Sequence, residues 1–269
     1  MLPESKTEMR LLKHHLASST DSNPLTIYVG SCPDYSHKEG LYDHKSLGEN
    51  VPLLSLYHLD LASRLLPVLE EMGVSYSYVI MVADVEADDE VFRSKYCGGE
   101  EGEFERRCQQ SVVKTRELVE SMGVIPQVKD KILASSFYTE FGKGQFLACQ
   151  KAYIETIRQR RSVDGSFNQR IVSDTAARMK MYRQVYGDYL TRTSYDKGFE
   201  FCESRTIRTM AQYLTLGKLM TEKSRLPVVI VHTTVNKNMF NARNKLLLLG
   251  EGEGRQQSLP ILEMKRRVY

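Results

Sequence analysis

The residues that could carry chemistry gather where apolar segments end, and the first such place is the end of LTIYVG (25–30). This segment is followed at once by Ser31, Cys32, Pro33 and Asp34. A small nucleophile at a sharp turn is held near backbone N–H groups that can stabilise an oxyanion, so Ser31 and Cys32 suit acyl transfer. The same residues also suit a structural role, in which Ser31 caps the turn and Cys32 fills a small buried space.

Carboxylates follow the second apolar segment, SYSYVIMVADV (75–85). Asp84 lies near the end of this run, and Glu86 and Asp88 open the acidic stretch that comes next. Acidic residues at the start of a helix complement its free N–H groups, which accounts for Asp88 and the residues after it. We expect Asp84 to face a ligand crevice, where carboxylates can bind a substrate amine or guanidinium. Nothing else in the sequence identifies metal ligands, so no bound metal is expected.

A histidine ends the third apolar segment, LPVVIVH (226–232). His232 fits a buried core histidine, and at a strand end it also fits a general base. The long helical pattern before it contains Glu203 and Tyr213. Tyr213 stands among Met210 and Leu214 on an apolar stripe, which indicates a core position rather than a reactive one.

Positive charge is concentrated between residues 151 and 183. This stretch holds eight Lys and Arg residues against three Asp and Glu, whereas the whole chain has 37 against 34. A solvated helix face is one explanation, and a surface that follows a phosphate backbone is another. The candidate phosphate ligands are Lys151, Arg158, Arg160, Arg161 and Arg178.

The elements that must position these residues follow an α/β pattern. We expect strands at 25–30, 75–85 and 226–234, and helices at 52–72, 101–122, 127–161, 167–190 and 200–223. A crossover as long as 52–72 implies that its two strands are parallel and connected in the right-handed sense. The sequence thus predicts a Rossmann-like parallel sheet flanked by helices, with its ligand crevice beyond the carboxyl ends of the strands.

Composition places limits on organisation and location. With 269 residues, of which 41% are hydrophobic, we expect a flexible N-terminus over 1–24, one catalytic domain over 25–250 and a C-terminal tail over 251–269. The five cysteines form no C-x-x-C pair, which argues against a disulfide framework and a structural zinc site. No segment approaches the roughly 20 apolar residues that span a bilayer. We therefore expect a soluble cytoplasmic protein without a membrane partner.

Taken in order, these features resemble the tRNA-dependent cyclodipeptide synthases, whose Rossmann-like fold is similar to the catalytic core of class I aminoacyl-tRNA synthetases. Family members carry a G-x-S-x-x-N-S turn after the first strand, which Gly30 to Ser36 match in outline. In this register Cys32 stands at the position of the acylated serine, and Tyr35 replaces the asparagine. The family's later tyrosine corresponds to Tyr213, but the glutamate that follows it by four residues is replaced by Gly217. The last strand keeps the family's histidine as His232 but lacks the tyrosine before it.

The resemblance implies an aminoacyltransferase. One aminoacyl-tRNA would donate its aminoacyl group to Ser31 or Cys32, a second would supply the attacking amine, and cyclisation would release a diketopiperazine without ATP or a cofactor. The general character is similar to a fungal group that makes arginine-containing products, so a carboxylate would hold an arginyl guanidinium. The implied site residues are catalytic Ser31, Cys32, Tyr213 and His232, and substrate-binding Gly30, Tyr35, Asp84, Glu86, Asp88 and Glu203, with the basic helices binding tRNA.

Two other functions fit parts of the sequence. Isocyanide synthases also have a strand, a proline-containing polar turn and a helix entry similar to SLGENVPLLSLYHL (46–59), and they would use a free amino acid and a sugar phosphate rather than tRNA. A non-catalytic RNA-binding protein would use the basic helices alone. Such a protein would keep its activity when Ser31 and Cys32 are replaced.

Overall fold

The computed structural model of the protein describes residues 6–31, 51–85, 98, 100, 102–121, 126–185, 194–232 and 246–251. The chain divides into two compact units, which are described separately below. The first unit consists of Met1–Gly142, Met220–Asn238 and Ala242–Tyr269, and the second of Lys143–Leu219 and Met239–Asn241. The second unit is therefore inserted into the sequence of the first.

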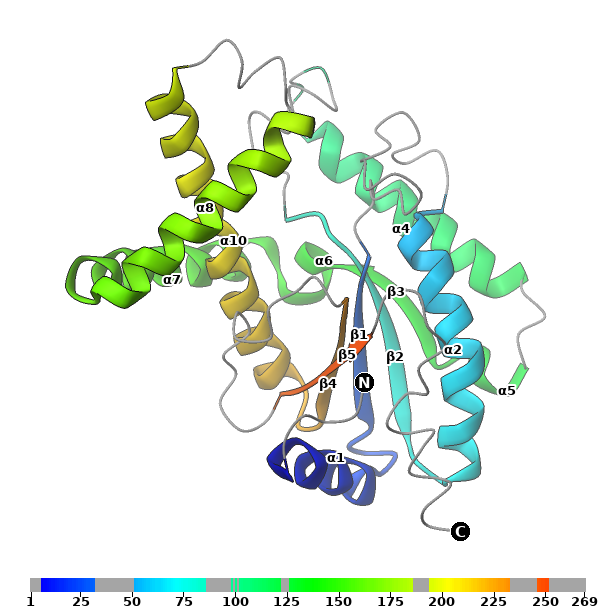
Figure 1. The fold of residues 1–269 in the computed structure, drawn as a ribbon. Helices are drawn as coiled ribbons and strands as arrows, with labels where there is room; N and C mark the ends of the chain where they lie inside the picture. The colour runs from blue at the N-terminus through cyan, green and yellow to red at the C-terminus, as the bar shows by residue number, and fades with distance from the viewer. Residues whose placement is uncertain are drawn as a thin grey trace. The chain divides into compact units, whose positions relative to one another are not determined.

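The first unit is built on a five-stranded parallel sheet (Figure 1). Its strands are β1 (Leu25–Ser31), β2 (Tyr76–Val82), β3 (Ile132–Ser136), β4 (Pro227–His232) and β5 (Leu247–Glu251). Their order across the sheet is β3-β2-β1-β4-β5, with β1 in the middle. A parallel sheet in this order with helices on its faces is a Rossmann-like α/β fold, which confirms the predicted fold class.

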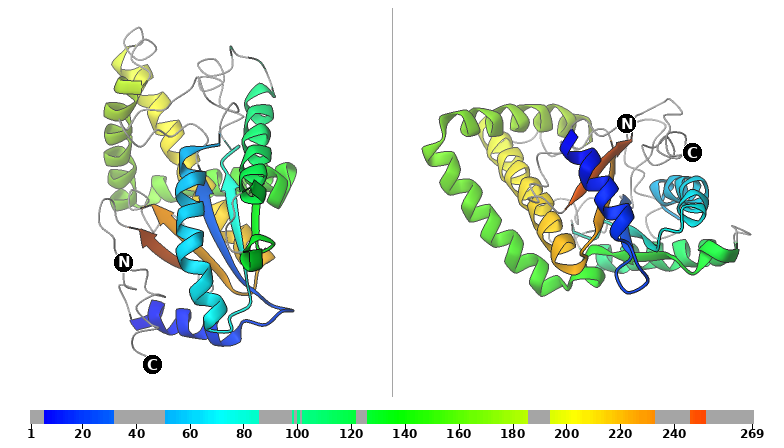
Figure 2. Two further views of the ribbon diagram at one scale, coloured as in Figure 1. Left: turned by 90° about the vertical axis from the view of Figure 1, so that its right-hand side faces the viewer. Right: turned by 90° about the horizontal axis from the view of Figure 1, so that it is seen from below.

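The helices of this unit are α1 (Lys6–Ser18), α2 (Leu53–Glu71), α4 (Glu103–Ser121), α5 (Pro126–Lys129) and α6 (Phe137–Phe141). Figure 2 shows α2 running along one face of the sheet, with β1 beside β2 behind it. α2 begins after Pro52 and ends at Met72, where Gly73 adopts a φ of +65° that glycine accommodates without strain. The predicted helix at 52–72 is confirmed.

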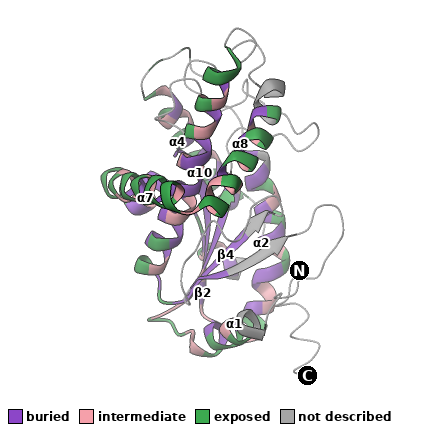
Figure 3. Cartoon of the chain, turned by 60° about the vertical axis from the view of Figure 1, so that its left-hand side comes forward, coloured by how far each residue is buried: buried purple, intermediate pink, exposed green. Residues whose placement is uncertain are grey.

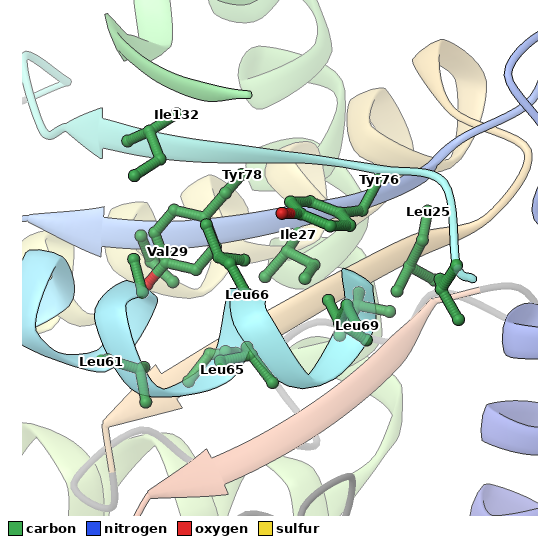
Figure 4. Packing of buried hydrophobic residues seen from close by; sticks show 14 of the residues in the cluster. Leu25, Ile27, Val29, Leu61, Leu65, Leu66, Leu69, Tyr76, Tyr78 and Ile132 are labelled. Atoms are coloured by element: carbon green, nitrogen blue, oxygen red, sulfur yellow. The ribbon is translucent and has the colours of Figure 1, made fainter. Parts of the chain in front are cut away.

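The main core lies between this face of the sheet and α2. Because strand side chains alternate, Leu25, Ile27 and Val29 of β1 all point to the same face, where they meet Leu65 and Leu69 of α2 (Figure 4). All five are completely buried. At about 25 cal/mol per Å² of apolar surface removed from water, such a layer supplies most of the favourable free energy of folding.

A hydrogen-bonded group on the surface of this unit ties α2 to the sheet. The Tyr76 hydroxyl donates to the Glu70 carboxylate at 2.8 Å, and the Lys131 ammonium donates to the same oxygen at 2.6 Å. These two hydrogen bonds, led by the one from Lys131, hold the pKa of Glu70 below its ordinary value.

Three parts of the fold differ from the sequence prediction. Residues 6–18 form α1, where a flexible segment was expected, because Leu12 and Leu16 stand one helical turn apart and pack into the main core. The predicted helix at 127–161 is wrong in its first part, since β3 and two short helices precede α7 there. The apolar run at 246–249 was not predicted to form a strand, but it contributes to β5, which pairs with β4.

The second unit is helical and comprises α7 (Lys143–Val163), α8 (Gly165–Val185) and most of α10 (Tyr195–Lys223), whose last residues belong to the first unit. These helices pack around a small core of Ile157, Ile171, Ile207, Met210 and Ala211. Figure 3 shows exposed residues along α7 and α8 and buried residues in the strands of the first unit. The predictions for α4, α8 and α10 are confirmed within several residues, apart from 186–190, which lie outside the described residues. None of the helices in the described ranges combines the length and apolarity needed to cross a membrane.

Candidate active site at the carboxyl edge of the sheet

The strand register brings three predicted site residues to one edge of the sheet. Ser31 of β1 pairs with Val82 of β2, and Asp84 follows two residues later. On the other side of β1, Val29 pairs with Ile230, and continuing that register by two residues sets Ser31 beside His232. The strand order turns between β1 and β4, because the chain proceeds through β2 and β3 on one side and through β4 and β5 on the other. Ligands of such sheets bind outside the carboxyl ends of the strands at this switch point.

Ser31 is the last residue of β1 and is completely buried. Its Oγ lies 2.8 Å from the Oγ of Ser55 on α2. The strand was predicted to end at Gly30 with Ser31 on the following turn, but Ser31 belongs to β1. The Ser31 carbonyl accepts a hydrogen bond from the Ala83 N–H at 2.9 Å, which extends the β1–β2 pairing and turns the Ser31 side chain towards α2.

His58 of α2 binds the residue before Ser31. Its Nε2 lies 2.8 Å from the carbonyl oxygen of Gly30. Because a carbonyl oxygen can only accept a hydrogen bond, Nε2 carries a proton and donates it to the Gly30 carbonyl. The backbone carbonyl of His58 in turn accepts a hydrogen bond from the Tyr78 hydroxyl at 3.0 Å. The end of β1 is thus held by two side chains of α2, Ser55 and His58, which are called the α2 pair below.

The Asp84 carboxyl is only 1% exposed and does not stand open to solvent. Its Oδ1 accepts a hydrogen bond from the backbone N–H of Tyr138 at 3.1 Å. Burial raises the pKa of Asp84 to about 6, although hydrogen bonds from Ser136 and Tyr138 act in the opposite direction. A carboxyl group with this pKa exchanges its proton near neutral pH, which is the property of a general acid or base.

Ser136 links Asp84 to neighbouring elements. It is the N-cap of α6, where its Oγ accepts from the Thr139 N–H at 3.2 Å, and it also accepts from the Gln109 side chain of α4 at 2.9 Å. Ser136 is completely buried, and its side-chain hydrogen bond to Asp84 lowers the carboxyl pKa. Sequence reasoning missed Ser136 because it did not predict β3, the strand that ends with this residue.

The structure describes the other residues predicted for this edge in less detail. Gly30 is exposed, and among the described residues no atom lies within 4 Å of the position that a Cβ would take there. For His232 the structure gives the strand position alone. Four predicted residues lie outside the described residues, namely Cys32, Tyr35, Glu86 and Asp88. Over the described ranges, no three His, Cys, Asp or Glu side chains come together as a metal-binding group.

In the second unit, a predicted substrate ligand and a predicted tRNA ligand bind each other. The guanidinium of Arg161 lies 2.7 Å from the Glu203 carboxylate and also donates to Asn168 at 2.8 Å. Both charged side chains are largely covered, being 32% and 19% exposed. This ion pair joins α7 to α10, so the positive charge of Arg161 is already partly neutralised by Glu203 inside the second unit.

The other basic candidates differ in their surroundings. Arg160 bonds Asp164 at 3.2 Å and stacks over the Phe167 ring at 4.4 Å from its centroid. Lys151 and Arg158 are exposed on α7. Arg178 of α8 and Tyr213 of α10 are half-buried. The exposed pair on α7 is therefore the part of the predicted basic surface that is most open to an external phosphate.

Comparison with known proteins identifies related folds. A cyclodipeptide synthase from Candidatus Glomeribacter gigasporarum, in a structure bound to Phe-tRNAPhe, is similar with a TM-score of 0.51 and 10% sequence identity, covering 93% of this chain and 94% of that chain. The PvcA protein from Pseudomonas aeruginosa is similar with a TM-score of 0.53 and 12% identity, covering 97% of this chain and 82% of that chain. No family model and no curated protein matches the sequence. At these identities the similarity establishes the fold, which is thus shared with both proteins over nearly the whole chain.

Proposed function

We propose that the protein is a tRNA-dependent cyclodipeptide synthase, an aminoacyltransferase that joins two aminoacyl groups into a diketopiperazine. The observation that carries the proposal is the position of the Ser31–Cys32 sequence, which begins at the end of β1 on the switch point of the sheet. Two further features support it. The fold is shared with a cyclodipeptide synthase that was solved bound to Phe-tRNAPhe, and the sequence carries a local excess of positive charge at residues 151–183.

The proposed reaction begins with transfer of an aminoacyl group to a side chain at the end of β1. The nucleophile loses its proton and attacks the ester carbonyl of the aminoacyl-tRNA, and the terminal ribose oxygen of the tRNA leaves with a proton. The amine of a second aminoacyl-tRNA then attacks the enzyme-bound acyl group and forms a dipeptidyl-tRNA, while the bond to the enzyme nucleophile breaks and the nucleophile takes up the proton lost by the amine. Finally the free amine of the dipeptide attacks the remaining ester, which closes the ring and releases the second tRNA.

We assign the nucleophile to Cys32 rather than Ser31. The Ser31 hydroxyl is completely buried and hydrogen-bonded to Ser55, so it has no access to an ester as bulky as aminoacyl-tRNA. A thiol is also intrinsically more nucleophilic near neutral pH than a serine hydroxyl, because a few per cent of it is already ionised. In this proposal Ser31 anchors the strand end, and Cys32 carries the aminoacyl group as a thioester.

The remaining predicted residues take roles around this step. We propose that His232, at the adjacent end of β4, exchanges protons with the reacting amine. Tyr35, Glu86 and Asp88 remain candidates for binding the aminoacyl groups. Lys151 and Arg158 are proposed to contact tRNA phosphates, and an arginyl group is proposed as one of the two substrates.

The experiment that tests this function uses the purified protein with aminoacyl-tRNAs charged with each of several amino acids, followed by mass spectrometry. A cyclic dipeptide should form, should disappear after ribonuclease treatment, and should be lost in Cys32→Ala but kept in part in Cys32→Ser. The arginyl proposal expects product only when arginyl-tRNA is present.

Two outcomes would refute the proposal in favour of another function. Conversion of a free amino acid and a sugar phosphate to an isocyanide, unaffected by ribonuclease, would assign the protein to the isocyanide synthases. Tight tRNA binding without any product, unchanged in Cys32→Ala, would instead assign it to non-catalytic RNA-binding proteins.

A further inference from the structure

We propose that the α2 pair, Ser55 and His58, are positioning residues that hold the end of β1 in the geometry required for acyl transfer. This inference rests on the proposed function, because it assigns a task to residues next to the proposed nucleophile. Neither residue belongs to the candidate site that the sequence indicates. Both are found only when the structure brings α2 against the end of β1.

The two side chains bind consecutive residues of the strand. Ser55 and His58 are three positions apart, so they lie on the same face of α2. The Ser55 hydroxyl is 2.8 Å from the Ser31 hydroxyl, and the His58 Nε2–H donates to the Gly30 carbonyl at 2.8 Å. One contact fixes a side chain and the other fixes the peptide group that joins Gly30 to Ser31. Together they restrict both the position and the rotation of the last peptide of β1.

The location of the pair is unusual for polar residues. Ser55 is completely buried and His58 is 3% exposed, on the same helix face as the apolar residues Leu59, Ala62 and Leu66. Burying a hydroxyl or an imidazole stabilises a protein less than burying an apolar side chain of similar size, since the lost contacts with water must be replaced. A break in an otherwise apolar stripe, hydrogen-bonded to the strand end, is typical of a functional constraint rather than of core packing.

Among the described residues, the side of the strand end opposite α2 is uncovered at Gly30. Gly30 is exposed, and within the described residues nothing lies within 4 Å of where its Cβ would stand. The α2 pair therefore holds the strand end from the core side, and we propose that the face on which Gly30 is exposed receives the substrate. A reacting group must be held to a fraction of an ångström, since a displacement of about 1 Å can cost about 100-fold in rate. Two short hydrogen bonds from a rigid helix provide such a hold.

The test compares substitutions that remove the two contacts with one that keeps a donor. In Ser55→Ala and His58→Leu, we expect kcat for cyclic dipeptide formation to fall by about 10-fold to 100-fold while KM changes by less than about 2-fold. His58→Gln places an amide N–H near the position of Nε2 and should recover most of the lost kcat. Ser63→Ala is the matched control, because among the described residues the Ser63 hydroxyl donates to the Asp60 carbonyl within α2 and does not contact the strand end.

A second control separates positioning from general stability. Tyr78→Phe removes the hydroxyl that bonds the backbone carbonyl of His58, and so weakens the attachment of α2 without touching Gly30 or Ser31. If kcat in all variants simply follows their thermal stability, including Tyr78→Phe, the positioning role is refuted. It is also refuted if Ser55→Ala and His58→Leu keep full kcat, or if His58→Gln loses as much as His58→Leu.

A measurement without substrate tests the contact itself. Nitrogen-15 NMR of the histidine rings should show His58 protonated at Nε2 in the unsubstituted protein. A ring protonated only at Nδ1 would overturn the inference whatever the activity. Absence of any product from the unsubstituted protein would refute the proposed function and, with it, a role of the pair in acyl transfer, whereas normal product with unaffected variants would refute the inference alone.

Discussion

The substitution Asp84→Asn tests the buried environment of this carboxyl, because asparagine keeps the shape of the side chain but cannot ionise. Burial raises the pKa of Asp84 from its ordinary value of 3.8 to about 6. As the pH rises, the carboxyl ionises first in the unfolded chain, which draws the equilibrium towards unfolding until the folded protein ionises as well. The neutral carboxyl therefore contributes fully to stability below pH 3.8, and this contribution is lost as the pH rises to about 6.

The size of the effect follows from the two pKa values. Each pH unit between them changes the free energy of unfolding by about 1.4 kcal/mol, so the interval from 3.8 to about 6 corresponds to about 3 kcal/mol. The assay is urea unfolding of the unsubstituted protein and of Asp84→Asn at a series of pH values from about 4 to about 8. The difference between the two curves largely removes the titration of all other groups. We expect the unsubstituted protein to lose about 3 kcal/mol relative to the variant up to about pH 6, and little above it.

Two results would refute this reasoning. A constant difference from about pH 4 to about pH 8 would mean that the carboxyl has the same pKa in the folded and unfolded states. A difference that changes in the opposite direction would mean that the hydrogen bonds from Tyr138 and Ser136 outweigh burial and favour the ionised form. In that case Asp84 would be an anchor for α6 that stays charged, and a proton-exchanging role near neutral pH would be excluded.

Three further predictions address other parts of the molecule. Glu70→Gln should give the opposite slope in the same assay, because hydrogen bonds led by Lys131 lower the pKa of Glu70 and its contribution is lost as the pH falls. Gly30→Ala should leave the thermal unfolding temperature unchanged within about 2 °C, because the described surroundings leave room for a methyl group. The same substitution should raise KM if substrate binds beside Gly30, and an unchanged KM would contradict the proposed site. Arg158→Ala should weaken tRNA binding and reduce the salt dependence of binding by about one counterion, without affecting urea unfolding. Arg161→Ala should instead lower the free energy of unfolding, because it breaks the ion pair with Glu203. Equal effects of the two substitutions on binding and on stability would contradict this division.

The elements that the sequence predicts well are those whose pattern is local. α2 repeats apolar residues at helical spacing over nineteen residues, and β1 and β2 are short β-rich runs. β3 is different, because ILASS contains only one residue with a strong preference for strands, Ile132, and it lies between segments of helical pattern. Its conformation comes from pairing with β2, from Tyr78 opposite Ile132 to Val82 opposite Ser136, which is a contact that no sequence window contains.

The candidate site was predicted only in part, because the sequence shows local patterns but not the contacts between distant segments. Strand ends are visible in the sequence, so Ser31, Asp84 and His232 were found at the edge where the register places them. The partners of these residues come from helices and from β3, whose approach depends on the completed fold. A signal for the α2 pair was nevertheless present, since Ser55 and His58 interrupt the apolar stripe of α2 at positions where packing alone favours leucine.

The central position of β1 has a consequence for synthesis of the chain. On the ribosome β2 appears soon after β1, but β4 at Pro227–His232 appears only after the whole inserted helical unit has been translated. At about 5–20 residues per second, one side of β1 remains without its neighbouring strand for roughly ten to forty seconds. During that interval the nascent polypeptide exposes an apolar β edge that can pair with other chains. The yield of native protein should therefore depend on translation speed and on chaperones that cover this edge.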